Sequence, residues 1–394
     1  MAQRRTRSPT WIDQRTQEEI LEDMMERFDE VNALYIAKVA AQIQTIGELN
    51  AASMHRIEVM ARMNADIAEI NSRLADAVQI NRRDLLRLYD RALNDMYRSP
   101  NFERAMRETP LPDIEKRRLN NLAQMIARQT AGTMQNLSNT TAVSETYRQI
   151  VDKAILTNVT GMGSYKEAMR DSIRDLGRNG MQVQYASGHR RRLDTAIRQN
   201  IIDGSNQIAQ HGSDMMGEAL GFDGYELSAH AASAPDHEPV QGRVFLKDQF
   251  ELMQAGLPFT DIDGRWYEGF RRPIGEWNCM HFAMSFDTQR SVRRYTDAQL
   301  RDWAQRNRAG CNIDGKQYTL YQARQLMRRI ETEVRRQKDT ATAARGAGDR
   351  ELQERCQRRI NALMGRYYKV AKTSGFRPRP DRTTVQGFKA VKVS

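Results

Sequence analysis

Side chains that can bind a metal or act as a nucleophile and base gather in two short blocks near the middle of the chain. His230 and His237 lie in residues 228–242, and Cys279 and His281 follow about 40 residues later in residues 275–281. Imidazole nitrogens and thiolate sulfur are the usual ligands of tetrahedral zinc. The same side chains form the nucleophile and base of thiol enzymes. These two blocks therefore contain the strongest candidates for metal-binding or catalytic side chains in the sequence.

Three interpretations of these blocks are open. In the first, the polar side chains form a buried hydrogen-bonded network that holds the loops in place. In the second, His230, His237, Cys279 and His281 bind zinc, although His-x6-His is an uncommon zinc spacing. In the third, Cys279 is a nucleophile activated by His237. We expect the first, with no metal, no cofactor and no catalytic residue. The members of this structural polar cluster are His230, Asp236, His237, Gln241, Asn278, Cys279 and His281.

The segment before these blocks is predicted to be helical over residues 17–97. Apolar residues recur there every three or four positions, and no proline interrupts residues 10–99, which favours one or two very long helices. The spacing is close to a heptad repeat without keeping to it strictly. We therefore expect these helices to pack against other helices. Those other helices can belong to further copies of the chain, so self-association through the N-terminal helices is one possibility.

The rest of the chain is predicted to be helical on both sides of a small α+β unit. Short strands are expected at residues 222–228 and 243–246, and Asp314-Gly315 indicates a hairpin turn within residues 311–319. The further predicted helices span residues 113–137, 143–158, 165–176, 190–220, 320–345 and 350–373. The fold class is therefore mainly α, with long N-terminal helices, a small central α+β unit and a basic C-terminal helical hairpin.

A linear division into domains accompanies this prediction. It comprises a mobile basic arm (1–14), a long-helix domain (15–144), a helical plus small α+β domain (145–290), and a basic helical hairpin with an extended tail (291–394).

The charge of the chain is uneven. Residues 290–394 hold 26 basic and 10 acidic side chains, a balance of +16, whereas the preceding residues have a balance of −5. Such asymmetry indicates a polyanionic partner, most often a nucleic acid. Basic residues recur along both C-terminal helices, and these rows suit contact with double-stranded DNA phosphates without base readout. The predicted contacts are Arg324, Arg328, Arg329, Arg335, Arg336, Lys338, Arg355, Arg358, Arg359, Arg366, Lys369 and Lys372. The alternative is a solvated, arginine-rich helix pair.

Other classes of protein are disfavoured by composition. Mean hydropathy is −0.73, and no apolar run approaches the roughly 18 residues that a bilayer span needs. The first ten residues are basic and polar, which argues against a secretory signal. Three widely spaced cysteines argue for a reducing compartment and against a disulfide scaffold.

Three segments together carry a resemblance to a known family. The first segment contains residues 161–165, Gly180, and residues 185–188 and 203–207. The second contains residues 228–230, 235–237 and 241–245, together with residues 278–281. The third contains residues 314–321, the helix from 331 to 336, and residues 375–383. In this order they resemble the phage minor capsid proteins related to the Mu F-type minor head proteins. The chain departs from the pattern at Ser233-Ala234, Val240 and Met280, where relatives carry Ala-Arg, Trp and Arg.

The resemblance implies a structural protein of a tailed bacteriophage. Such a protein resides in the virion, at the capsid interior, and in the host cytoplasm during assembly. Its expected partners are the portal protein or the major capsid protein, with no membrane. Its expected role is head assembly and DNA packaging or delivery, with sequence-independent DNA contact through the basic C-terminal region. An ejected internal DNA-binding protein is the alternative, and a metal- or cysteine-dependent enzyme is the second.

Overall fold

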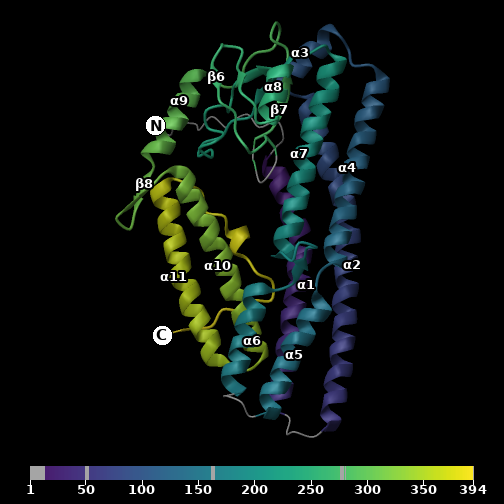
Figure 1. Ribbon diagram of the computed structural model, residues 1–394, viewed down its shortest axis with the longest axis vertical. Coiled ribbons are helices and arrows are strands. Elements are labelled where there is room, and N and C mark those ends of the chain that lie inside the picture. The colour runs from purple at the N-terminus through teal and green to yellow at the C-terminus, as the bar shows by residue number, and fades with distance from the viewer. Residues whose placement is uncertain (1–13, 49–52, 161–164, 276–278, 280, 394) are drawn as a thin grey trace. The chain divides into compact units, whose positions relative to one another are not determined.

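The computed structural model describes residues 14–48, 53–160, 165–275, 279 and 281–393. The chain is mainly α-helical, as predicted, with a few short strands (Figure 1). The predicted N-terminal arm, the turn at residues 161–164 and Asn278 lie wholly or almost wholly outside the described residues. Two compact units are each assembled from three separate segments of chain. The first unit comprises Met1–Leu21, Arg82–Gly132 and Gln199–Ala323, and the second comprises Glu22–Asn81, Thr133–Arg198 and Arg324–Ser394. The linear domain boundaries stay a prediction.

The long N-terminal helices form where the apolar spacing predicts them. Helix α1 spans Gln14–Glu48 and α2 spans Ser53–Tyr97. In α1 the residues at three- and four-residue steps, from Met24 and Phe28 to Tyr35 and Ile43, are almost fully buried. Their burial explains why a weakly heptad-like pattern gives long helices, since one apolar face of each helix is covered by protein.

The second unit is built mostly from helices. Besides most of α1 and most of α2, it contains α5 (Val143–Thr160), α6 (Tyr165–Asn179), most of α10 (Leu320–Gly346), and α11 (Arg350–Ser374). Figure 1 shows α10 and α11 side by side as the predicted C-terminal hairpin. The tail beyond α11 is not wholly extended, because Pro380–Thr383 form a short 3-10 turn.

One predicted helix begins later than expected. Residues 190–192 form strand β2 (Arg190–Arg192), which pairs antiparallel with β1 (Gln182–Gln184), and helix α7 begins only at Leu193 and ends at Ala219. The backbone N–H of Leu193 donates to the carbonyl of Met181, which closes this small ribbon before the helix starts. Strand pairing therefore takes the residues that helical periodicity assigned to the first turn of α7.

The first unit holds the small α+β module, which was predicted from short strands at residues 222–228 and 243–246. Its sheet has the order β4-β3-β7, all antiparallel, from β3 (Gly224–Leu227), β4 (Val244–Leu246) and β7 (Ala283–Phe286). Helix α8 (Lys247–Gln254) and the hairpin of β5 (Phe259–Thr260) and β6 (Trp266–Tyr267) pack with the sheet. The apolar core beneath them includes Leu227, Phe245, Phe259 and Ala283.

Helix α7 anchors the edge strand of this sheet. The hydroxyl of Ser213 accepts a hydrogen bond from the backbone N–H of Ser285 at 2.7 Å, and the Ser285 hydroxyl donates to the Ser213 carbonyl at 2.9 Å. The first bond satisfies the Ser285 N–H at the outer edge of β7, which would otherwise be an unpaired backbone donor, and the second ties the same residue to α7.

The remaining elements of the first unit are α3 (Pro100–Glu108), most of α4 (Asp113–Asn139), α9 (Asp297–Ala309), and the predicted hairpin β8 (Cys311–Ile313) and β9 (Lys316–Tyr318). In this hairpin Asp314 and Gly315 have φ angles of 54° and 79°. Both turn residues are left-handed, as a type I′ turn requires. Among the described helices, none combines the length and the apolar character that a bilayer-spanning segment requires.

Candidate functional site

The two sequence blocks that contain His230, His237, Cys279 and His281 lie together in the α+β module. One block is the loop that leaves β3 and returns in β4, and the other is the segment that leads into β7. Because β3 pairs with both β4 and β7, the sheet brings these two segments together. His237, Cys279 and His281 lie at the junction with exposed fractions of 0%, 3% and 2%.

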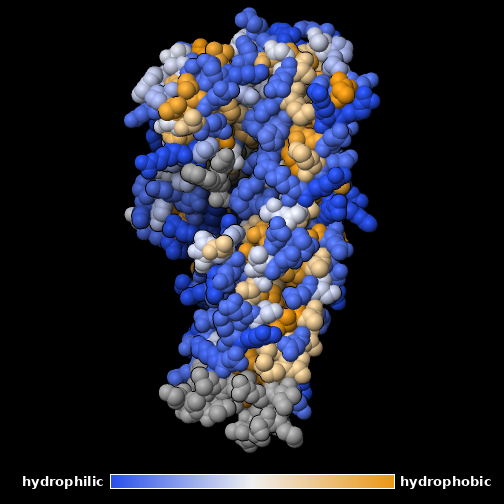
Figure 2. Space-filling model, turned by 45° about the vertical axis from the view of Figure 1, so that its right-hand side comes forward, coloured by the Kyte–Doolittle hydropathy of each residue, from blue (hydrophilic) through white to orange (hydrophobic). Residues whose placement is uncertain are grey.

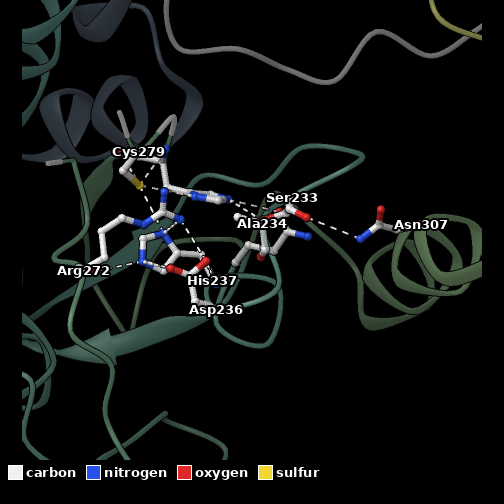
Figure 3. Close-up of polar contacts among 9 residues, drawn as sticks. Ser233, Ala234, Asp236, His237, Arg272, Cys279 and Asn307 are labelled. Atoms are coloured by element: carbon white, nitrogen blue, oxygen red, sulfur yellow. Dashed lines mark hydrogen bonds and ion pairs between the residues drawn. The ribbon is translucent and has the colours of Figure 1, made fainter. Parts of the chain in front are cut away.

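Both imidazole Nδ1 atoms face the sulfur. The Cys279 Sγ atom lies 3.2 Å from His237 Nδ1 and 3.5 Å from His281 Nδ1, and the backbone N–H of His281 donates to the same sulfur at 3.4 Å. Figure 3 shows Cys279 and His237 within this network, with Arg272 beside them. The sulfur is therefore the centre of the cluster.

The outer ring nitrogens are held by oxygen acceptors. His237 Nε2 lies 2.8 Å from the Arg272 carbonyl oxygen. His281 Nε2 lies 3.3 Å from Gln241 Oε1 and 3.3 Å from Ser233 Oγ. The backbone N–H of His230 donates to Gln241 Oε1 at 3.0 Å, so that atom is an acceptor. Both histidines therefore donate from Nε2, and both Nδ1 atoms carry a lone pair.

Charged groups flank the cluster on one side. Arg272 Nη2 donates to Asp236 Oδ1 at 2.8 Å and lies 3.4 Å from His237 Nδ1. Asp236 also accepts from the backbone N–H of His237 at 3.0 Å. The imidazole of His230 stacks on that of His281 with ring centroids 4.5 Å apart. Six of the seven predicted cluster residues therefore come together, and Asn278 lies outside the described residues.

Burial favours the neutral form of each central group. It lowers the pKa of His237 and lowers that of His281 well below its usual value. Burial also raises the pKa of the Cys279 thiol, against backbone hydrogen bonds from Gly275 and His281 that lower it. A reactive cysteine needs access and a depressed pKa. This environment therefore does not favour the thiol-enzyme interpretation.

Three contributors to the site, Ser233, Arg272 and Asn307, were not among the predicted cluster residues. Arg272 supplies both a carbonyl and a guanidinium, and Asn307 of α9 donates to the Ser233 carbonyl at 3.4 Å and to Glu238 Oε2 at 2.5 Å. The only local signal for Arg272 is the Arg271-Arg272-Pro273 triplet shortly before Cys279. Nothing local marks Asn307, because it reaches the loop from another helix.

A family model, Phage minor capsid protein 2, matches residues 12–367. The chain belongs to this family. No curated protein and no solved structure matches it. The predicted family is thus confirmed, and the protein is a structural virion component of a bacteriophage. Membership of a capsid family favours a structural role over an enzymatic one.

The family model includes most of the basic hairpin, where the predicted phosphate contacts divide into two groups. On α10, Arg335 forms ion pairs with Asp194 and Asp29, Arg336 lies 3.9 Å from Glu333, and the Lys338 ammonium donates to the Thr383 carbonyl at 2.7 Å. Arg324 and Arg328 are half-buried, and Arg329 is exposed. Much of the α10 row is thus engaged within its own unit.

The α11 row is more exposed, although Arg355 pairs with Glu351 at 3.2 Å. Arg355, Arg358, Arg359, Arg366, Lys369 and Lys372 are all exposed. No acidic residue occurs in α11 after Glu354. With 100° between successive residues, the first five of these side chains fall within one face of the helix. Helix α11 therefore presents a basic face to solvent.

Proposed function

We propose that this minor capsid protein acts inside the phage head as a structural component that contacts packaged DNA through the exposed basic face of α11. The observation that carries the proposal is the row of Arg358, Arg359, Arg366 and Lys369 on a helix segment without acidic residues. A row of cations on one helix face matches the repeating phosphates of a duplex and reads no bases.

Salt dependence of DNA binding tests this proposal. The full chain is titrated with a duplex of arbitrary sequence at several salt concentrations. Replacement of Arg358, Arg359, Arg366 and Lys369 by Gln should reduce the slope of log K against log [salt] by about 3 to 4, because each phosphate contact releases close to one counterion. The matched control replaces Arg83, Arg91, Arg117 and Arg128, exposed arginines of α2 and α4, and should leave the slope unchanged. Equal slopes for the two variants would contradict DNA contact through α11.

We further propose that the long N-terminal helices make the contacts with the portal protein or the major capsid protein. Helices α1 and α2 line a groove of about 310 Å³ whose apolar residues are Val31, Leu34, Ala77 and Ile80. Ile80 is 51% exposed. Figure 2 shows apolar colours interrupting the hydrophilic surface on the face that includes α2. An apolar groove with charged rims supports contact with another protein.

Particle composition tests the location. Mass spectrometry of purified particles should find the chain before and after DNA release if it docks on the head. Loss of the chain together with the DNA would instead support the ejected DNA-binding protein. An Ile80→Asp variant should be depleted from particles, whereas a variant at exposed Ile114 (51% exposed), Ile114→Asp, should be incorporated normally.

A further inference from the structure

The geometry around Cys279 matches that of a metal site in four respects. The first is spacing. The ligating atoms of His237, Cys279 and His281 all lie within 4.8 Å of one another. In a tetrahedral zinc site with Zn–S of about 2.3 Å and Zn–N of about 2.0–2.1 Å, sulfur and nitrogen are about 3.5 Å apart. The observed separations of 3.2 and 3.5 Å between Sγ and the two Nδ1 atoms are close to this value.

The second respect is the orientation of the imidazoles. A histidine that binds a metal usually donates its other ring N–H to an oxygen, which fixes the tautomer. His237 does this to the Arg272 carbonyl and His281 does it to Gln241 Oε1. Both lone pairs therefore converge on the space next to the sulfur, although the two histidines belong to different segments.

The third respect is the environment of the sulfur. The backbone N–H of His281 donates to Sγ at 3.4 Å, and such donors stabilise a metal-bound thiolate. The nearby charges also balance, because Asp236 pairs with Arg272. A bound dication with one thiolate therefore adds only one net positive charge to the cluster.

The fourth respect is the weakness of the surrounding structure. The strands on either side have three or four residues, and the long connection between β3 and β4 contains Ala232 with a left-handed φ of 60°. Left-handed backbone is unfavourable for a residue with a Cβ. A metal shared by this connection and the segment before β7 would hold both in place.

The metal-free alternative is a chain of hydrogen bonds. In it Arg272 donates to His237 Nδ1 and the Cys279 thiol donates to His281 Nδ1. The first of these bonds is long, at 3.4 Å, and the guanidinium has a closer partner in Asp236 at 2.8 Å. Without a metal, His237 Nδ1 therefore depends on this long bond, whereas one metal ion would bind both Nδ1 atoms.

We propose that Cys279 Sγ, His237 Nδ1 and His281 Nδ1 bind one Zn²⁺ that joins the β3–β4 connection to the segment before β7. Three protein ligands leave one tetrahedral position for a solvent molecule. The ion would act structurally, by joining two segments of the α+β module whose strands have only three or four residues.

Metal content of the untagged full chain tests the proposal. Protein purified with zinc and without chelators should contain one zinc per chain by mass spectrometry of the metal. Cys279→Ala and His281→Ala should retain less than about a tenth of it. Cys311→Ala and His211→Ala, which alter a cysteine and a histidine elsewhere in the same unit, should retain it fully. Zinc retained equally in Cys279→Ala, or absent from the wild-type chain, would overturn the proposal.

A second measurement does not depend on the folding of variants. The wild-type chain, stripped with a chelator and still helical by circular dichroism, is titrated with Co²⁺. One equivalent should produce the intense visible bands of tetrahedral cobalt and a sulfur-to-cobalt charge-transfer band. Failure of both bands to develop would contradict the site. Neutralising the α11 basic face should leave this titration unchanged, so the metal and DNA proposals fail independently.

Discussion

The hydroxyl of Tyr367 lies 2.8 Å from Glu331 Oε1 and joins the two helices of the basic hairpin. Tyr367 is fully buried on α11, and Glu331 of α10 is 7% exposed. The same hydroxyl accepts the backbone N–H of Arg379 at 2.8 Å, which fastens the tail to the hairpin. Burial raises the pKa of Glu331, and the hydrogen bond from Tyr367 opposes this shift. One phenol therefore connects α10, α11 and the tail.

Replacing Tyr367 by Phe should destabilise the hairpin. The variant keeps the ring but removes the donor to a buried carboxylate, and hydrogen bonds to charged groups contribute about 1.5–3 kcal/mol. Urea denaturation should show a loss of this size. The neighbouring Tyr368 is 49% exposed, and Tyr368→Phe should change stability by less than about 0.5 kcal/mol. Equal effects of the two substitutions would show that the hydroxyl contact contributes little.

Arg335 should behave as a structural residue. Its guanidinium contacts Asp194, and its Nη2 lies 4.0 Å from Asp29 Oδ1, while the side chain of Asp194 is 5% exposed. Removing one partner of a buried ion pair typically costs about 3–5 kcal/mol, because the other charge remains buried. Arg335→Met should therefore lower the free energy of unfolding by about this amount. Arg329→Met, on the exposed side of α10, should lower it by less than about 0.5 kcal/mol. If Arg329→Met is the more destabilising of the two, the ion pairs of Arg335 do not make the expected contribution to stability.

These arginines show where prediction from the sequence stops. The periodicity of Arg324 to Lys338 predicted a basic helix, and α10 is one. Whether each guanidinium faces solvent depends on acids far away in the chain, since Asp29 and Asp194 lie 306 and 141 residues before Arg335. Spacing along one helix carries no information about such partners. The α11 row could be predicted more fully, because its exposed side has no acidic neighbour after Glu354 in the helix itself.

The central cluster shows the same division. Residue types alone selected six residues that the structure brings together, because buried polar side chains need partners and the two blocks contain them. The hairpin at Asp314-Gly315 was predictable from local backbone preference alone. Arg272 was not, because its contribution to the cluster depends on how the segment between β6 and β7 folds back onto the β3–β4 connection.

Glu226 should make the stability of the first unit depend on pH. It is 2% exposed on β3, and burial raises its pKa to about 7 despite the opposing effects of Arg294, Tyr295 and Arg293. The folded chain therefore holds a proton that the unfolded chain releases at about pH 4.5. The contribution to stability is complete below about pH 4.5, falls as pH rises to about 7, and is constant above that, with a total loss on the order of 3 kcal/mol.

The Glu226→Gln variant isolates this effect. It keeps the carbonyl oxygen that accepts the Arg294 N–H at 2.6 Å and removes the titration. Its stability relative to wild type should increase between pH 5 and pH 8, measured by urea denaturation with tryptophan fluorescence. Trp303 is a suitable reporter, since it packs edge-on against Tyr295. Exposed Glu268→Gln should follow the wild-type curve. Parallel pH curves for wild type and Glu226→Gln would rule out Glu226 as the titrating group.

Replacing either of two glycines of the second unit by alanine should change stability, but in opposite directions. A Cβ at Gly177 of α6 would lie 2.4 Å from Thr340 Cα and 2.5 Å from Thr340 N, and backbone atoms of α10 cannot turn away as a flexible side chain can. Overpacking of this kind costs about 1–3 kcal/mol. Gly365 of α11 has no atom within 4 Å of the same position, so Gly365→Ala should raise stability by about 0.5–1 kcal/mol through helix propensity. Thermal denaturation of the two variants measures both signs. A stabilising Gly177→Ala would mean that α6 and α10 do not approach as closely as the contact with Thr340 requires.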